Sequence, residues 1–370
     1  MSISVTQVAR DLIAIPSVSS QSNAEVSQYA RNVLLREGFE VERLSYDDHG
    51  LEKVSLVARK GAGRGGIGFF SHSDTVPGDI GWAPFDPVIA DGRLFGRGSC
   101  DMKGPLAATM AAAANLDVKA LKRPVYVVVT ADEEVGYGGA YQVAAQSELF
   151  AENWPAFGVV AEPTRLRPVY SHKGGALVTV HAIGAAAHSS TEKGVSANFK
   201  IAPFLAEMAA LVPVFRTDPR YLNPEFSPPS FGFNMIVTDY GTKSNVTAPK
   251  TTALLSLRDM PNVDNDGAVA LLVDAAKRHG LEVAVKRNPY FYVRPDSEMV
   301  RMACEACGGI APETVAFGTE AIIFEAKLPN QVVLGPGDIA QAHTVGEYID
   351  VAQLEQAVGV YQRLIERACG

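Results

Sequence analysis

Histidines and acidic residues occur in five short segments of the 370-residue chain, and each segment follows a stretch that predicts a buried strand. The segments are 69–74, 98–104, 130–134, 160–163 and 341–344. In open α/β sheets, functional side chains gather where the strands end. We therefore expect the five segments to build one site.

The residue types in these segments suit metal-dependent hydrolysis. His72 and Asp74 are two residues apart, so on an extended chain their side chains share a face. This spacing suits a metal-binding imidazole whose second nitrogen is held by a carboxylate. Glu133 and Glu134 are adjacent and point in different directions, so one can bind a metal ion while the other acts as a base toward a water molecule.

The charges of the acidic residues indicate two metal ions. The carboxylates of Asp101, Glu134 and Glu162, together with one hydroxide, balance two divalent cations. Neutral His72 and His343 complete two near-tetrahedral sets of nitrogen and oxygen ligands, a pattern that fits zinc. The sequence therefore predicts a dinuclear zinc centre.

Each segment taken alone has an ordinary explanation. A single histidine after a strand is usually a hydrogen-bonded structural residue, and a pair of glutamates is usually solvated surface. Five such segments in order, all after predicted strands, argue against coincidence. The pair Cys304 and Cys307 can mark a redox or metal site, but both fall near the end of a predicted helix, which favours two buried or partly buried thiols.

The elements that must position these residues alternate between strand and helix, which is typical of an α/β domain with a largely parallel sheet. Helical spacing covers 4–36, 105–115 and 140–150. Buried strands are predicted at 54–58, 67–70, 125–129 and 157–161.

The pattern changes after residue 173. Residues 176–183 alternate between apolar and polar, as a half-exposed antiparallel strand does. Further strands are predicted at 232–238, 252–257 and 281–286, with helices at 197–211 and 264–279. A chain of 370 residues is longer than a single hydrophobic core usually accommodates, so two domains are expected. We predict a catalytic domain of residues 1–173 plus 288–370, interrupted by an α+β, ferredoxin-like domain of residues 174–287.

Composition narrows the class of protein. Hydrophobic residues make up 47%, charged residues 20%, and the formal net charge is −8, which argues against disorder, nucleic-acid binding and an anionic membrane surface. No signal-peptide pattern and no apolar run of about 18 residues are present. Four cysteines are too few for a disulfide framework. We expect a cytoplasmic protein.

The five segments resemble those of a zinc-dependent family that includes acetylornithine deacetylase, succinyl-diaminopimelate desuccinylase, aminoacylase and related carboxypeptidases. The resemblance extends over essentially the whole chain. It implies that His72 and Glu162 bind one zinc ion, that Glu134 and His343 bind the other, and that Asp101 bridges them. It also implies that cobalt can replace zinc.

Further roles follow from the same resemblance. It implies that Glu133 is the general base, that Asp74 orients His72, and that the peptide between Asp101 and Met102 is cis. The activity implied is hydrolysis of the amide bond of a small N-acyl amino acid.

In the predicted inserted domain, His188 resembles the histidine that crosses a dimer interface in this family to stabilise the oxyanion. Asn245 and Arg258 resemble residues that grip the substrate carboxylate. Asn245 can equally be a turn residue, and Arg258 can equally form a surface ion pair. The segment after His188 lacks the proline usual in the family, and its asparagine, Asn198, is shifted, so the substrate contacts of this loop stay open. The resemblance implies a homodimer.

Glu162 helps to choose among members of the family. Deacylases and carboxypeptidases tend to have Glu here, whereas aminopeptidases and dipeptidases tend to have Asp. Together with the segments 172–174 and 318–321, Glu162 is most similar to its counterpart in acetylornithine deacetylase. The alternatives are a desuccinylase, another N-acyl-amino-acid deacylase or carboxypeptidase, and a non-catalytic binding relative. The suitable residues at every ligand and base position argue against the last of these.

Overall fold

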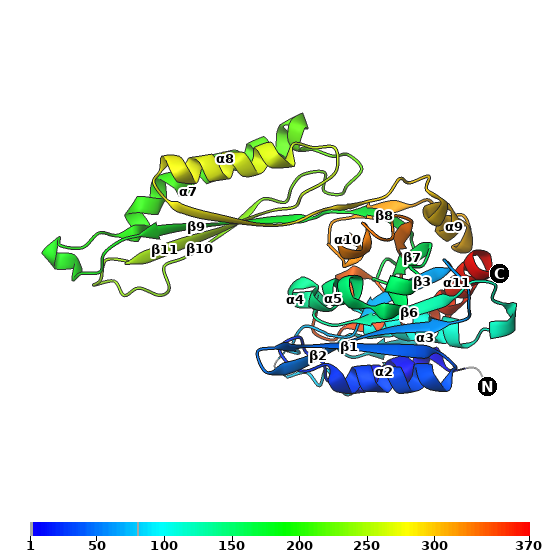
Figure 1. The fold of residues 1–370 in the computed structure, drawn as a ribbon. Helices are drawn as coiled ribbons and strands as arrows, with labels where there is room; N and C mark the ends of the chain where they lie inside the picture. The colour runs from blue at the N-terminus through cyan, green and yellow to red at the C-terminus, as the bar shows by residue number, and fades with distance from the viewer. Residues whose placement is uncertain (1–2, 80) are drawn as a thin grey trace. The chain divides into compact units, whose positions relative to one another are not determined.

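The computed structural model describes residues 3–79 and 81–370, and this part of the chain divides into two compact units (Figure 1). The first unit comprises the described residues up to Tyr170, together with Val293–Glu313 and Thr319–Gly370. The second unit comprises Ser171–Tyr292 and Thr314–Gly318. The boundaries predicted from the sequence were 173/174 and 287/288, and the short return of the chain at 314–318 was not foreseen.

A nine-stranded sheet holds the five segments in place. Its order is β1-β2-β6-β3-β7-β15-β8-β13, with β14 paired to β8. The central strands β6, β3, β7 and β15 are parallel, and the flanking pairs of this path are antiparallel. The strands are β1 (Glu40–Asp48), β2 (Leu51–Lys60), β3 (Ile67–His72), β6 (Val125–Thr130), β7 (Phe157–Val160), β8 (Val169–His172), β13 (Phe291–Tyr292), β14 (Glu313–Val315) and β15 (Gln331–Val333). The expectation of a mostly parallel central sheet is confirmed.

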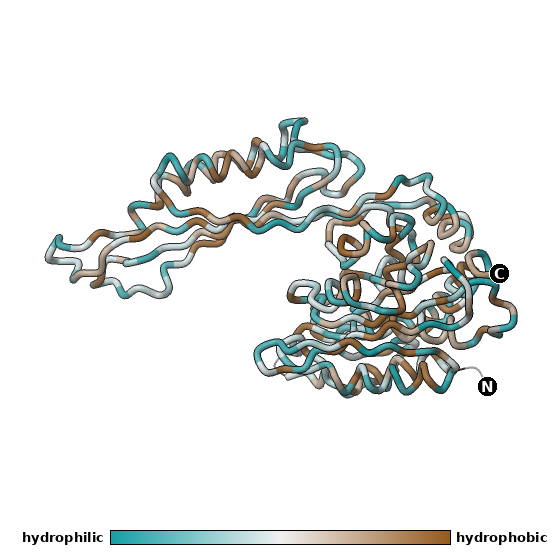
Figure 2. The backbone as a smooth tube through the Cα atoms, in the orientation of Figure 1, coloured by the Kyte–Doolittle hydropathy of each residue, from teal (hydrophilic) through white to brown (hydrophobic). Residues whose placement is uncertain are grey.

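Helices cover both faces of this sheet. Phe69 and Phe70 are neighbours on β3 and therefore point to opposite faces. Phe69 packs on Tyr361 with ring centroids 5.0 Å apart, whereas Phe70 packs on Phe324 at 4.5 Å. Every residue of β3, β6 and β7 is buried as a result, and Figure 2 shows hydrophobic stretches along these strands.

The helices of the first unit are α1 (Val5–Ala14), α2 (Ala24–Arg36), α3 (Lys103–Ala114), α4 (Glu133–Gly136), α5 (Gly138–Gln146), α6 (Glu148–Glu152), α9 (Glu298–Ala306), α10 (Ala321–Phe324) and α11 (Val351–Cys369), with short 3₁₀ turns η1 (Val118–Ala120) and η4 (Ile339–Gln341). A small sheet joins β4 (Val88–Ala90), β5 (Arg93–Phe95) and β16 (Tyr348–Asp350). Cys304 and Cys307 are free and only partly buried at the end of α9, as expected.

The predicted helix over residues 4–36 was wrong in one respect, because it is two helices separated by residues 15–23. Pro16 has no backbone N–H to continue a helix. The polar side chains in the gap bond elsewhere: Ser17 donates to the Ser73 carbonyl at 2.6 Å, and Asn23 donates to the Ser73 hydroxyl at 2.9 Å. The gap therefore supports the segment that carries His72.

The second unit is a four-stranded antiparallel sheet of order β10-β11-β9-β12 with two long helices packed against it. Its elements are β9 (Gly175–Ile183), η2 (Ser189–Thr191), α7 (Ala197–Thr217), η3 (Pro219–Tyr221), β10 (Asn234–Thr238), β11 (Lys250–Leu257), α8 (Asn265–Arg278) and β12 (Glu282–Asn288). In β9, Val178 and Val180 are fully buried whereas Leu177 and Ile183 are exposed. The predicted half-exposed strand is confirmed.

The helix α7 is longer than the helix predicted at 197–211. It runs past Leu211 to Thr217, and it has the length and composition of a membrane-crossing helix, the only one among the described residues. Lys200, Glu207 and Arg216 interrupt its apolar residues, so it contains no uninterrupted apolar run of about 18 residues, as expected. One side of α7 packs in the core of the second unit through Ile201, Phe204 and Met208.

Candidate metal centre

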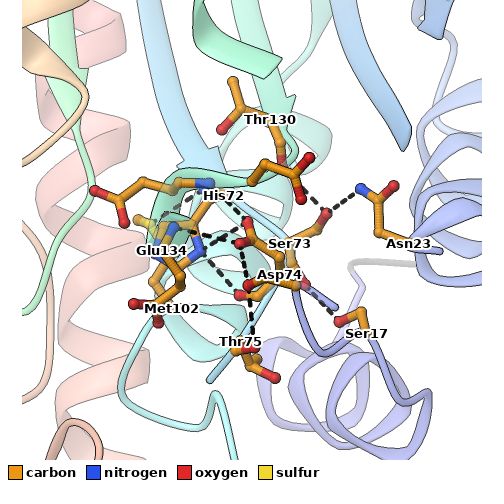
Figure 3. Close-up of polar contacts among 12 residues, drawn as sticks. Ser17, Asn23, His72, Ser73, Asp74, Thr75, Met102, Thr130 and Glu134 are labelled. Atoms are coloured by element: carbon orange, nitrogen blue, oxygen red, sulfur yellow. Dashed lines mark hydrogen bonds and ion pairs between the residues drawn. The ribbon is translucent and has the colours of Figure 1, made fainter. Parts of the chain in front are cut away.

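The His72 ring lies at the end of β3, with its two nitrogens facing different partners (Figure 3). Nε2 lies 3.1 Å from Asp101 Oδ1 and 3.7 Å from Glu162 Oε1. All three side chains are almost completely buried. These residues form the first of two groups in the site.

The second group, His343 and Glu134, lies near the other carboxylate oxygen of Asp101, Oδ2. His343 Nε2 is 3.4 Å from Asp101 Oδ2 and 3.1 Å from Glu134 Oε2. Donor atoms of His72, Asp101 and Glu134 all lie within 4.8 Å of one another. The structure thus brings together all five side chains that the sequence suggested as ligands, with the Asp101 carboxylate between the two histidines.

The strand order explains this convergence. β6 and β7 flank β3 in parallel, so the segments that follow these three strands emerge at the same edge of the sheet. His72 ends β3, Glu134 lies in the turn after β6, and Glu162 follows β7 by two residues. His343 comes from the loop after η4 and has a positive φ of 61°.

The side chains present fit metal binding on two observations. Glu162 Oε1 is buried and accepts no hydrogen bond from any described residue. Burial raises the pKa of Glu162 well above its usual range, and the nearby Asp101 carboxylate adds to the effect. A buried carboxylate oxygen without a hydrogen-bond donor, near two histidines and two further carboxylates, indicates a site that can accept a cation.

Protons supply part of that charge in the metal-free protein. Hydrogen bonds to Asp101 and Glu134 raise the pKa of His343 to about 10. Burial raises the pKa of Asp101, but its interactions with His343 and His72 lower that pKa by more, so it lies well below its usual range. Metal ligands must be deprotonated, so cations bound here would displace protons from the histidines.

Asp74 does more than the sequence suggested. The His72 Nδ1 atom lies 2.9 Å from the Asp74 backbone carbonyl and 3.5 Å from its carboxylate. That carboxylate accepts the Ser19 hydroxyl at 2.7 Å and the backbone N–H groups of Glu133 and Glu134 at 3.1 and 3.3 Å. Asp74 therefore positions the turn that carries the two glutamates as well as facing the ring.

Glu133 has a side chain suited to proton transfer. Its backbone is held by Asp74, yet its carboxylate accepts no hydrogen bond from the described residues. Burial raises the pKa of Glu133 well above its usual range, and the nearby carboxylates of Glu162 and Asp101 raise it further. A carboxyl group of raised pKa beside a cation site is suited to take up and release a proton.

A buried ion pair behind this turn was missed by sequence reasoning. Lys53 Nζ lies 2.6 Å from Asp132 Oδ1 and donates to the Ser19 carbonyl at 2.5 Å. Tyr46 donates to the other Asp132 oxygen at 2.6 Å. Asp132 has a left-handed backbone with φ 57° and immediately precedes Glu133, so this network fixes the start of the turn.

Two other buried acids near the site were also missed. Glu320 accepts the Thr130 hydroxyl at 2.7 Å, and burial raises its pKa to about 7. Glu347 is completely buried and accepts the backbone N–H of Asp101 at 3.0 Å. Neither acid follows a predicted strand. Glu320 belongs to the segment 318–321 that contributed to the resemblance, but neither acid was predicted to lie near the site.

The remaining predicted residues lie in the second unit, at the two ends of its sheet. His188 is exposed before η2, and its Nδ1 lies 2.7 Å from the Ser190 hydroxyl. The Asn245 carbonyl accepts the Ser189 N–H at 2.9 Å, so these two loops lie side by side. Arg258 follows the far end of β11 and lines a cavity of about 310 Å³. The structure therefore does not bring Arg258 together with His188 and Asn245 within the second unit.

The fold and the cluster of histidines and carboxylates define a metallohydrolase of the α/β class, and the chain belongs to the peptidase family M20/M25/M40, whose model matches residues 68–367. It is 36% identical to an acetylornithine deacetylase of Myxococcus xanthus, over 97% of this chain and 96% of that protein. It is 32% identical to an acetylornithine deacetylase of Proteus mirabilis, over 98% and 96%.

Solved structures show the same fold. An M20 family metallo-carboxypeptidase of Sulfolobus solfataricus superposes with a TM-score of 0.75 at 18% identity, covering 98% of this chain and 99% of that one. A Bacillus subtilis protein described as a dinuclear metal binding peptidase from the M20 family gives 0.63 at 18% identity, covering 99% and 97%. The expected fold and family are confirmed.

Proposed function

We propose that the chain is a dinuclear zinc amidohydrolase that deacylates a small N-acyl amino acid, with N-acetyl-L-ornithine as the substrate and L-ornithine and acetate as the products. The observation that carries this proposal is the Asp101 carboxylate, with one histidine beside each of its oxygens. Full-length similarity to two acetylornithine deacetylases supports the substrate. This reaction would place the chain in arginine biosynthesis, in the cytoplasm.

In this proposal His72 and Glu162 would hold one zinc ion, Glu134 and His343 would hold the other, and Asp101 would contribute to both. The Bacillus subtilis relative described as binding two metals supports this count, and cobalt would substitute for zinc. Bound zinc would supply Lewis-acid chemistry, polarising the acyl carbonyl and acidifying a water molecule.

The residues of the chain perform the proton transfers. The Glu133 carboxylate takes a proton from the attacking water as the new carbon–oxygen bond forms. When the carbon–nitrogen bond breaks, Glu133 gives that proton to the leaving amine. The Asp74 carboxylate accepts the Glu133 backbone N–H and so holds Glu133 in place. The Glu133 carboxylate stays free to move the proton.

We further propose a homodimer formed through the second unit, in which His188 stabilises the oxyanion in the site of the partner subunit. Support comes from the positions of the predicted substrate contacts. Asn245 and Arg258 flank β11, whose eight residues span roughly 25 Å. One small substrate cannot contact both ends of this strand, so joint contacts require two chains.

A second candidate is an acyl donor with an additional carboxylate, as in succinyl-diaminopimelate. The cavity at Arg258 is also lined by Lys286, Gly175 and Asn288. Neither Arg258 nor Lys286 forms an ion pair with a described carboxylate. Two unpaired cations at one cavity favour a ligand with two carboxylates.

One panel of substrates tests both candidates. The metal-free protein is incubated with zinc or cobalt and with acetylornithine, acetylcitrulline, acetylmethionine, acetylglutamate or succinyl-diaminopimelate, and kcat/KM is compared. We expect acetylornithine to give the highest value and chelation to abolish turnover. A preference for acidic substrates that Lys286→Met removes would favour the second candidate. No hydrolysis with either metal would indicate a binding relative instead.

A further inference from the structure

Glu347 is the most heavily hydrogen-bonded buried acid near the candidate metal centre, yet it is not one of the proposed ligands. Its side chain has no exposed surface. Oε1 accepts the backbone N–H groups of Cys100 at 2.8 Å and Asp101 at 3.0 Å. Oε2 accepts Arg97 Nη1 at 2.7 Å and the Gly98 N–H at 3.1 Å. All four donors belong to one five-residue stretch, 97–101.

This stretch ends at the residue whose carboxylate lies between the two histidines. Because the Asp101 N–H itself donates to Glu347, the bond fixes the backbone from which the Asp101 side chain projects. Asp101 is the one residue shared by both groups of the site, with Oδ1 beside His72 and Oδ2 beside His343. A small rotation here would move both oxygens at once.

Glu347 also belongs to the loop that carries His343, which precedes Glu347 by four residues. Its backbone carbonyl accepts the Gly96 N–H at 3.0 Å, which adds a second bond between the two segments. Arg97 extends the connection, because its guanidinium lies 3.7 Å from Asp79 and over the ring of Trp82. One short loop therefore supplies a proposed ligand and the carboxylate that holds another.

We propose that Glu347 is a positioning residue that sets the Asp101 carboxylate relative to His343 and so determines how tightly both metal ions bind. Groups that hold a metal ligand in place typically change metal affinity or activity by roughly 10–100-fold when they are removed. The proposal rests on the dinuclear centre proposed above.

The chemistry of the pocket makes Glu347→Gln a sharp test. Each carboxylate oxygen accepts two hydrogen bonds from N–H donors. Glutamine has nearly the same shape, but it replaces one oxygen with an NH2 group that can only donate. Whichever way the amide points, two N–H groups then face another donor, and the stretch 97–101 must move.

Zinc binding to metal-free protein, measured by calorimetry, is the primary readout, and the absorption spectrum of the cobalt-loaded protein is the second. The matched control is Glu42→Gln. Glu42 also accepts two backbone N–H groups, of Glu148 and Leu149, and the Ser147 hydroxyl, but it contacts no proposed ligand. Thermal unfolding of the metal-free variants reports any general loss of stability.

We expect Glu347→Gln to weaken zinc binding at both sites by roughly 10–100-fold and to change the cobalt spectrum, whereas Glu42→Gln changes neither. Equal zinc affinity in Glu347→Gln and wild type would overturn the inference. If Glu347→Gln does not fold, Glu347→Asp decides. It keeps the charge but shortens the side chain, so we expect a smaller loss of affinity, and affinity equal to wild type contradicts the proposal. Wild-type protein that binds no zinc would refute the proposed metal centre itself.

Discussion

Single side chains of the candidate centre have separable tasks, because backbone contacts hold some of them while their side-chain atoms stay free. The Glu133 N–H is bound by Asp74, but its carboxylate accepts no hydrogen bond from the described residues. The Glu134 carboxylate instead lies 3.1 Å from His343. Two adjacent glutamates are thus separated into a proposed base and a proposed ligand.

Glu133→Ala should retain both metal ions and lose turnover. A general acid-base residue contributes about 10²–10⁴-fold, and one that acts in both proton transfers can contribute more. Metal content and kcat for acetylornithine are measured on the same sample, with wild type treated identically. Near-normal kcat in the variant, or loss of metal together with activity, would rule out the role of a non-ligand base.

Glu134→Ala and His343→Ala should each lose one metal ion selectively. His343 Nε2 lies 3.1 Å from Glu134 Oε2 and 3.4 Å from Asp101 Oδ2, whereas His72 Nε2 lies against the other Asp101 oxygen. Zinc titration by calorimetry should show one weakened site and one preserved site. Glu162→Ala is the matched variant for the other site. Equal weakening of both sites by His343→Ala would contradict the division into two groups.

At the scale of elements, the turn at α4 depends on partners from strands and loops far away in the sequence. Lys53 lies in β2 and pairs with Asp132 across 79 positions of the chain. Glu347 and Asp101 are 246 positions apart. The buried strands and their acidic ends were predictable, because β-branched runs and polar residues are local signals. Contacts between distant residues leave no local pattern, so these supporting residues could be identified only in the folded chain.

The N-terminal helices show a different limit of prediction. Apolar residues keep helical spacing through most of residues 4–36, yet Pro16 and the polar residues after it leave the helix to support Ser73. Similarly, α7 continues through Pro213 where the sequence suggested its end. Tertiary contacts decided both cases against the local preference.

Lys53→Met should destabilise the metal-free protein by about 3–5 kcal/mol, because it leaves the Asp132 carboxylate buried without its cation. Urea unfolding measures the loss. Adding Asp132→Asn should recover much of it, since the uncompensated charge is then removed. The control Arg43→Met breaks the exposed pair with Glu52 on the neighbouring strands and should cost less than about 1 kcal/mol. If both single variants cost the same, the buried pair does not stabilise the turn.

At the scale of the whole molecule, the chain holds its proposed chemistry in the first unit and its proposed substrate contacts in the second. The exposed side of α7 presents Phe199, which is 83% exposed, and β10 and β12 are the edge strands of the second sheet. An unpaired edge and an exposed aromatic residue suit association with a second copy. These features support the proposed homodimer.

His188 gives the strictest test of that dimer. If it acts in the site of the partner subunit, His188→Ala should lose activity by about 10²-fold or more, as expected for a missing oxyanion donor. Mixing inactive Glu133→Ala with inactive His188→Ala and allowing subunits to exchange should restore activity. Half of the dimers are then mixed, and each holds one site with both residues intact, so recovery should reach up to roughly a quarter of wild type. Mixing Glu133→Ala with Glu134→Ala is the control, because both residues belong to the same unit and no intact site can form. A fully active His188→Ala protein, or exchanged mixtures that stay inactive, would exclude the crossing role.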